Sequence, residues 1–299
     1  MMHNKKFSFY LCLSVFIAFV FFLYGPTITI ILLSFQGPEG GLTFPMNGVS
    51  THWFTKLFEG GGYVDIGAAF RRSLLLGTIV MVLTVVLSVA AGMAFRKRFL
   101  GSDTLFYLTI SSLIVPSIIL SLGIALEFRL LDETIKIIGA TFNIEWILND
   151  FQTSLAMLSS GLGAQLTWTL PFGLLIMFAV FNRFDKSLEE AARDLGASPW
   201  QTFTNVVLPI IGPSILGIAL FGFTLSYDEL ARSSQVMGAT NTLPLELKGL
   251  TTTVTTPVIY ALGTLTTAVS FCAIFIFLSL FLVFRNKANK RLSKEVVPE

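Results

Sequence analysis

Long stretches without a charged residue constrain the fold of this chain more than any other feature. Six of them cover residues 7–35, 73–95, 104–126, 151–182, 195–227 and 249–284. A helix needs about 20 apolar residues to cross a membrane, so each stretch can hold one crossing. Continuous apolar runs are typical of helices, unlike the weak alternation of outer-membrane barrels. We predict an all-α membrane protein with six transmembrane helices, at about 8–34, 70–95, 104–127, 153–182, 207–229 and 257–284.

The composition supports a lipid-facing surface. Charged residues make up 13% of the chain, whereas soluble domains carry roughly 25%. Lys5 and Lys6 precede the first apolar stretch, as in a signal peptide. That stretch is longer than a signal core of about 7–15 residues and has no small-residue cleavage site, so we expect a retained first helix.

The distribution of Lys and Arg favours one orientation. Six crossings place both termini on the same side. If that side is cytoplasmic, 13 of the 20 basic residues lie inside, as the positive-inside rule requires. The outside then has 11 of the 18 acidic residues. This acidic outer face either concentrates a cation or reflects only the scarcity of bases in outer loops.

Several site types find no support in the sequence. Cys12 and Cys272 lie inside apolar stretches and suit neither a disulfide framework nor a metal site. The only histidines are His3 and His52, which argues against a histidine-based metal or catalytic cluster. A phosphate-binding G-x-x-x-x-G-K-[ST] loop is missing, as are the H-E-x-x-H and G-x-S-x-G motifs. We expect no catalytic residues and no bound metal.

A short charged hairpin interrupts the apolar pattern before the fifth crossing. Ser187 and Glu190 have the spacing of a capping box. The helix that follows carries an apolar stripe, and Glu189 can pair with Arg193 one turn later. Gly196 is suited to end this helix. The stripe consists of Leu188, Ala191, Ala192 and Leu195.

A second short helix completes the hairpin. Ser198 and Gln201 form another capping box, with Pro199 at the first helical position. The helix runs to about Val206, and Pro209 marks the start of the fifth crossing. Helices this short are marginal in water alone, so they must dock on something. That surface is either the protein's own helices or a partner, and spacing leaves both open.

The hairpin resembles the EAA motif of ABC importer permeases. The matching pattern is Glu190-Ala191-Ala192, Gly196 and Leu208-Pro209, with Val206 where isoleucine is usual. The resemblance implies a type I ABC importer permease fold with cytoplasmic coupling helices at about 186–206. It also implies that these residues transmit motion from a dimer of ATP-binding subunits. ATP and Mg²⁺ would be bound by those subunits, so this chain needs no cofactor of its own.

Further segments resemble the second permease of spermidine/putrescine uptake systems. They are Trp168–Phe172, "FTLSYDELARSSQ" at 223–235, "LPLELKGL" at 243–250 and "PVIYALGTL" at 257–265. The similarity covers about residues 68–285. We expect an N-terminal helix and loop (1–67), the permease domain (68–285) and a basic cytoplasmic tail (286–299). Relatives that transport phosphonates, opines or ferric iron share much of this pattern, so the substrate stays open.

The same resemblance implies the partners. We expect a second permease subunit, as a heterodimer, and a secreted solute-binding protein. The location is the bacterial inner membrane, in contact with lipid and not with nucleic acid. An ion-coupled secondary transporter is the alternative, although such a carrier needs charged groups or broken helices near the midplane. The predicted crossings carry no charge through their centres.

Candidate substrate-path residues lie at the end of the fifth crossing and beside Pro171 in the fourth. Tyr227, Asp228 and Glu229 end the fifth crossing, where two acids oppose the helix dipole. Asp228 either pairs with Arg232 or forms an acidic gate for a cation, with Tyr227 offering an aromatic face. Trp168 and Phe172 either line the path or pack against lipid and neighbours.

Overall fold

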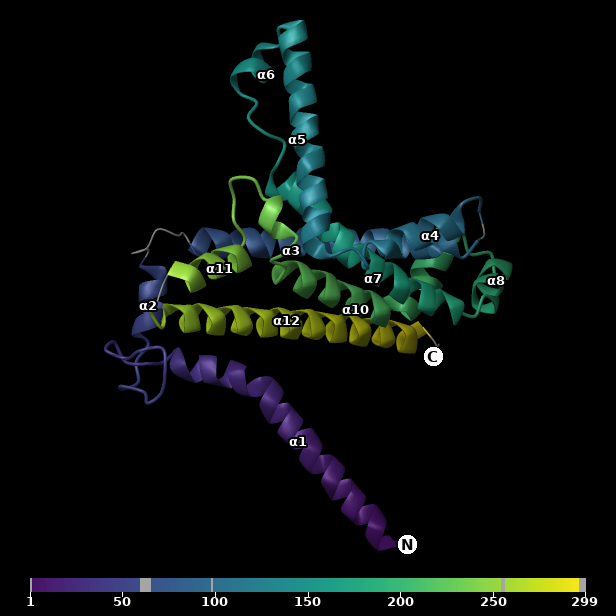
Figure 1. The fold of residues 1–299 in the computed structure, drawn as a ribbon. Coiled ribbons are helices and arrows are strands. Elements are labelled where there is room, and N and C mark those ends of the chain that lie inside the picture. Colours follow the sequence, from purple (N-terminus) through teal and green to yellow (C-terminus); the bar gives the residue numbers. More distant parts are fainter. Residues whose placement is uncertain (1, 60–65, 98, 254–255, 296–299) are drawn as a thin grey trace. The chain divides into compact units, whose positions relative to one another are not determined.

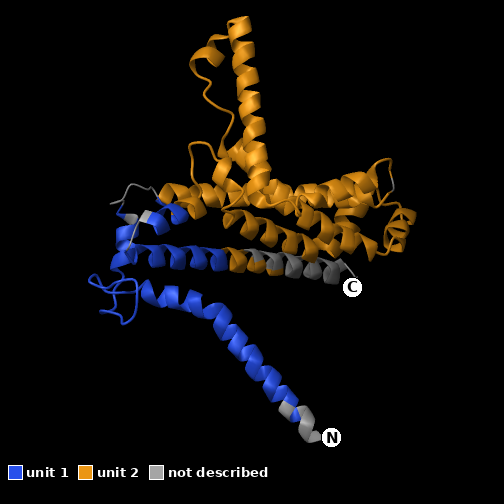
Figure 2. Cartoon of the chain, viewed as in Figure 1, with its two compact units in different colours: residues 1–66, 247–272 blue, residues 67–246, 273–299 orange. Residues whose placement is uncertain are grey.

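The computed structural model describes residues 2–59, 66–97, 99–253 and 256–295. Throughout these ranges the regular structure is helical, apart from an isolated bridge between Gln36 and Val49. The chain divides into two compact units, which Figure 2 distinguishes by colour. Unit 1 comprises residues 1–66 and 247–272, and unit 2 comprises residues 67–246 and 273–299. The predicted all-α fold is confirmed.

Unit 1 contains α1 (Met2–Leu33) and α2 (His52–Phe58). The loop between them is organised by the buried side chain of Gln36. Its amide nitrogen donates to the carbonyls of Gly41 and Thr43 at 3.1 and 3.3 Å, and its oxygen accepts from the amide of Asn47 at 2.9 Å. Every polar atom of this buried side chain is therefore satisfied, as burial requires.

Unit 2 contains most of the remaining helices, labelled in Figure 1. Two helices contribute to both units, α11 (Leu243–Thr253) and α12 (Val258–Glu295). The last four residues of the predicted tail lie outside the described residues. Unit 2 otherwise comprises α3 (Ile66–Phe95), α4 (Ser102–Ser111), α5 (Ser117–Phe142), α6 (Glu145–Asn149), η1 (Met157–Gly161), α7 (Leu162–Asn182), α8 (Ser187–Asp194), α9 (Pro199–Thr202), η2 (Phe203–Val207), α10 (Leu208–Tyr227) and η3 (Ser233–Gln235).

Five helical segments of the described chain are long and apolar enough to cross a membrane. They match the predicted first, second, fourth, fifth and sixth crossings. η1 runs directly into α7, and α9 runs through η2 into α10, so that each makes one continuous segment. The five are Ser8–Leu33, Ile66–Phe95, Met157–Asn182, Pro199–Tyr227 and Val258–Ile276.

The predicted third crossing, 104–127, is not one helix, and this prediction was wrong. α4 ends at Ser111 and α5 begins at Ser117, with turns between them. Pro116 cannot donate a backbone hydrogen bond and disfavours a helical conformation at the residue before it. Its ψ of 130° redirects the chain, and α5 projects away from α3, α7 and α10 of the same unit (Figure 1).

Asp132 fixes the return of the chain from α5 to η1. Its carboxylate accepts from the Thr153 hydroxyl at 2.6 Å, the Ser154 amide at 2.8 Å and the Ser154 hydroxyl. Burial alone raises the pKa of Asp132, but these hydrogen bonds outweigh it and the pKa lies below its usual value. The carboxylate therefore stabilises this connection above its pKa, and the contribution is lost as the pH falls through it.

The core of unit 2 lies where α3, α7 and α10 approach closely. Small residues on α3 permit this approach: Ser73, Gly77, Thr84, Ser88 and Gly92 are all buried. The hydroxyls of Thr84 and Thr169 lie 2.7 Å apart across the α3–α7 contact. Small residues and interhelical hydroxyl contacts are what drive helix association where lipid is the solvent.

Gly173 in α7 tests this packing. A Cβ there would lie 2.1 Å from the Ser88 hydroxyl oxygen and 3.2 Å from Ile218. We predict that Gly173→Val destabilises the protein by about 1–3 kcal/mol, the usual penalty for overpacking. Gly163→Val is the matched control, since Gly163 lies in the same helix and a Cβ there meets nothing within 4 Å. Thermal unfolding in detergent that is equal for both variants would contradict this packing.

Candidate functional site

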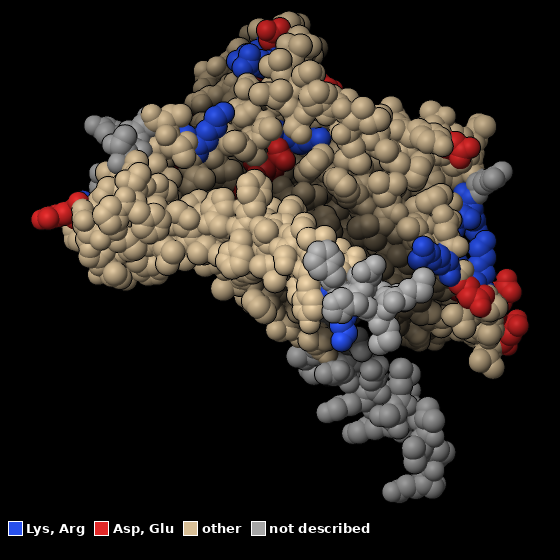
Figure 3. Space-filling view, turned by 60° about the horizontal axis from the view of Figure 1, so that its bottom comes forward, with Lys and Arg blue, Asp and Glu red and all other residues tan. Residues whose placement is uncertain are grey.

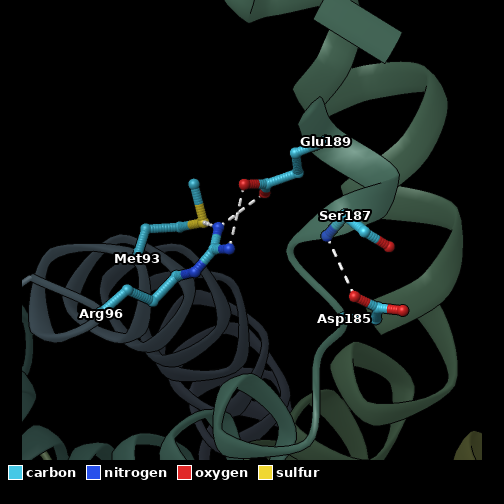
Figure 4. Close-up of polar contacts among 5 residues, drawn as sticks. All are labelled: Met93, Arg96, Asp185, Ser187 and Glu189. Carbon is cyan, nitrogen blue, oxygen red and sulfur yellow. Dashed lines mark hydrogen bonds and ion pairs between the residues drawn. The ribbon is translucent and has the colours of Figure 1, made fainter. Parts of the chain in front are cut away.

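The hairpin predicted from 187–206 forms, but its first helix begins differently from the prediction. The Ser187 hydroxyl caps nothing, and α8 has no side-chain cap. Instead, the Asp185 carboxylate accepts from the Ser187 amide at 3.0 Å, a contact drawn in Figure 4. This hydrogen bond lowers the pKa of Asp185. The capping box at Ser187 was wrong because an acid two residues earlier competes for the same free amides.

The turn and the second cap agree with the prediction. Gly196 has a φ of +85°, the left-handed conformation that glycine adopts without penalty. Ser198 accepts from the Gln201 amide at 3.3 Å, while the Gln201 side chain accepts from the Ser198 amide at 2.8 Å. This reciprocal capping box has Pro199 at the start of the helix. The direction of the chain between α8 and α9 is thus set by local chemistry.

Pro209 does not separate the hairpin from the fifth crossing. α9, η2 and α10 form one helical segment from Pro199 to Tyr227. The π-helical turn η2 (Phe203–Val207) ends two residues before Pro209. Proline removes one backbone donor, and a wider turn next to it is one way for a helix to accommodate that loss. α10 is therefore joined to the hairpin by continuous helix and not by a loop.

The apolar stripe of α8 remains largely uncovered. Leu188 is 46% exposed and Leu195 is 90% exposed, and Trp200 of α9 is 71% exposed. Ala191 is also exposed, while Ala192 is partly covered. Of the two surfaces that could dock the hairpin, the protein's own helices do not cover this stripe.

An ion pair links α8 to the end of α3. Arg96 Nη1 and Nη2 donate to Glu189 Oε1 and Oε2 at 2.6 and 3.0 Å (Figure 4). The two side chains are only 11% and 14% exposed. The predicted Glu189–Arg193 pair was wrong. A bidentate Arg–carboxylate contact is stronger and more directional than an exposed pair one turn apart, which explains the choice of partner.

Aromatic rings complete the surroundings of Arg96. Its guanidinium carbon lies 5.0 Å from the Phe181 ring centre and 5.1 Å from that of Phe184. Met93 Sδ lies 3.6 Å from Nη1. The sequence analysis missed Arg96 as a site residue and counted it only as a cytoplasmic base. The available signal was its position directly after the charge-free stretch 73–95.

Charged atoms gather at this edge of unit 2. Figure 3 shows Lys and Arg next to Asp and Glu on the side that carries α8 in Figure 1, while most of the remaining surface in view is uncharged. An exposed apolar stripe flanked by charges of both signs suits a protein partner and not lipid.

At the opposite end of α10, the three predicted path residues differ in their surroundings. Tyr227 is 2% exposed, and its ring stacks on Phe223 at 5.6 Å with an interplanar angle of 13°. Asp228 is exposed, and Glu229 is partly buried. Glu229 Oε1 accepts from the Arg232 amide at 2.8 Å. Of the three, only Asp228 is exposed.

Arg232 does not pair with Asp228, so this alternative was wrong. The residue is buried at 0% exposure, and its guanidinium donates to the hydroxyls of Ser117 and Thr167 and the carbonyl of Ser112. Its guanidinium carbon lies 4.8 Å from the Trp168 ring centre. A local i,i+4 pairing was expected, but the deeper site offers an aromatic face and three acceptors instead.

Trp168 and Phe172 contact each other on α7. Their rings lie edge to face with centres 5.3 Å apart, and Phe172 in turn stacks on Phe221 at 6.5 Å. Both residues are partly buried. The structure thus brings Trp168 and Arg232 together but leaves Phe172 in an aromatic cluster between α7 and α10. A role of either ring in a substrate path stays a prediction.

Comparison with known families covers the segment that contains the hairpin. Residues 84–288 match the family described as binding-protein-dependent transport system inner membrane component. The chain belongs to this family. Family membership removes the alternative of an ion-coupled secondary transporter. The match includes α7, α8 and α10 in full, and it begins within α3.

Curated permeases cover most of the chain. The spermidine/putrescine transport system permease protein PotC of Haemophilus influenzae is 27% identical over 82% of this chain and 86% of its own length. The putrescine transport system permease protein PotI of Escherichia coli K12 is 28% identical over 82% of this chain and 81% of its own length. This chain is therefore a transport permease subunit similar to these proteins.

Solved structures support the fold. A bacterial alginate ABC transporter in complex with an alginate-bound periplasmic protein has a chain that matches with a TM-score of 0.63 and 14% identity, over 97% of this chain and 96% of that chain. A second structure of an alginate-importing ABC transporter matches with a TM-score of 0.68 over 93% of this chain. At this identity the similarity concerns the fold alone.

Proposed function

We propose that this chain is the permease subunit of an ATP-driven importer and that α8 docks on a separate ATPase subunit. The observation that carries the proposal is the uncovered stripe of α8 within a family-matched segment. The hairpin is firmly capped at Ser198 and tied to α3 by Glu189, yet Leu195 remains 90% exposed. A rigid helix with an unburied apolar face is suited to insert into a groove on a partner.

The permease itself does no chemistry in this proposal. ATP and Mg²⁺ are bound by a dimer of ATPase subunits, each of which engages one permease. A second, different permease completes the translocation path, and a secreted protein delivers the solute. Both termini lie in the cytoplasm, as the excess of Lys and Arg on that side favours.

We infer that the solute is a polyamine such as putrescine. The support comes from the names of the relatives PotC and PotI and from the acids at the end of α10. A polyamine loses hydration when it enters the path and needs carboxylates or aromatic faces in exchange. Asp228 is exposed and available for this contact, whereas the Tyr227 ring is stacked on Phe223 and the Trp168 face is taken by Arg232.

Gly196 tests the docking of α8. Valine is strained at a φ of +85°, whereas asparagine tolerates this conformation better than most residues. We expect Gly196→Val to lose association with the ATPase subunit and transport, with Gly196→Asn close to the unaltered protein. The measurement is co-purification of the tagged permease with the ATPase, followed by uptake. Equal association and uptake for all three proteins would contradict the role of the hairpin.

The acids at the end of α10 test the substrate. We expect Asp228→Asn with Glu229→Gln to lower putrescine uptake by about tenfold or more, since contacts to charged groups contribute about 1.5–3 kcal/mol. Uptake is measured with radiolabelled putrescine and normalised to assembled complex. The control is Glu127→Gln with Glu133→Gln, which removes the same charge from exposed positions on α5. Full normalised uptake in the first variant would remove these acids from the path.

A further inference from the structure

The contact between Arg96 and Glu189 joins parts of the chain that are far apart in sequence. Glu189 lies in the first turn of α8, and Arg96 follows the last residue of α3, 93 positions earlier. α8 is otherwise joined through the chain to α7 by residues 183–186 and to α9 by residues 195–198. Among the residues that the structure describes, this is the ion pair that connects α8 to the second crossing.

The geometry of the pair is directional. Two parallel hydrogen bonds of 2.6 and 3.0 Å fix both the distance and the orientation of the two side chains. Phe181 and Phe184 cover the guanidinium of Arg96, so it has little freedom to swing with a moving carboxylate. A displacement of Glu189 must therefore either move the end of α3 or break the pair.

The pair is also protected from water, so breaking it costs more than breaking a surface contact. At 11% and 14% exposure, neither group is free to replace its partner with solvent at no cost. Separation would leave two nearly buried charges unpaired. Moving the two helices together keeps the pair intact and avoids this cost.

We propose that Arg96 and Glu189 form a positioning pair that makes α8 and the adjoining end of α3 move as one body when the partner ATPase closes. The proposal rests on the ATPase docking proposed above. Force applied to the outward stripe of α8 reaches α7 and α10 through the chain, but it reaches α3 through this pair. The pair contacts neither solute nor nucleotide in this account.

The direct test measures the distance between the two helices in the assembled complex. Spin labels are placed on cysteines at Ala94 in α3 and Asp194 in α8, both exposed, after Cys12 and Cys272 are replaced by serine. Distances are recorded without nucleotide and in the complex trapped with ATP and vanadate. We expect the same distance in both states with the pair intact, and a shift between states in Arg96→Gln or Glu189→Gln.

Transport provides a second readout that simple loss of stability does not reproduce. We expect Arg96→Gln to cause a loss of putrescine transported per ATP hydrolysed, because motion of α8 is then no longer passed to α3. The KM for putrescine delivered by the binding protein should stay unchanged. Arg96→Lys keeps the charge but not the bidentate contact, so its transport per ATP should lie between the values of the unaltered protein and Arg96→Gln. The lysine variant also provides the same test if Arg96→Gln does not assemble. The control is Lys97→Gln, which removes an exposed charge from the next residue.

The outcomes separate this inference from the proposed function. If the assembled, unaltered complex shows a changed Ala94–Asp194 distance between the two states, the pair does not unite the helices. An unchanged ratio of transport to hydrolysis in both Arg96 variants would overturn it equally. If the unaltered chain binds no ATPase, the proposed function itself fails, and the role of the pair fails with it.

Discussion

The cost of placing charge in hydrocarbon governs the organisation of this permease. Charged side chains are excluded from the centres of the five long apolar segments and gather where these segments end. Arg96 and Glu189 meet at such an end, between α3 and α8. Asp228 and Glu229 lie at the far end of α10. The positions of these two candidate sites thus follow from where the chain can leave lipid.

The packing inside unit 2 also reflects lipid as the surrounding solvent. Lipid gives little hydrophobic drive for helices to associate, so close contact depends on small residues and shared hydroxyls. Gly173 lies against Ser88, and Thr84 contacts Thr169. These contacts bring α3 and α7 together. Arg96 can then reach Glu189, because the ends of α3 and α7 are already close to α8.

Local signals in the sequence predicted the turn and the second helix of the hairpin, but not the start of its first helix. Gly196 and the Ser198 capping box act within a few residues, so their geometry could be read from spacing alone. Contacts between residues far apart in the sequence could not be predicted in this way. The sequence offered Arg193 and Asp228 as nearby ion-pair partners, whereas the fold supplied Arg96 for Glu189 and the face of Trp168 for Arg232. The break at Pro116 was also missed, because proline is tolerated in many membrane helices.

The central claim is that the outward face of α8 is covered by an ATPase in the cytoplasm. It is tested by the reactivity of one cysteine at Leu195 in a chain without Cys12 and Cys272. We predict no labelling by an impermeant thiol reagent in intact cells. In inside-out vesicles we predict rapid labelling without the ATPase subunit and protection when it is present. Labelling in intact cells, or equal labelling with and without the ATPase, would contradict the account.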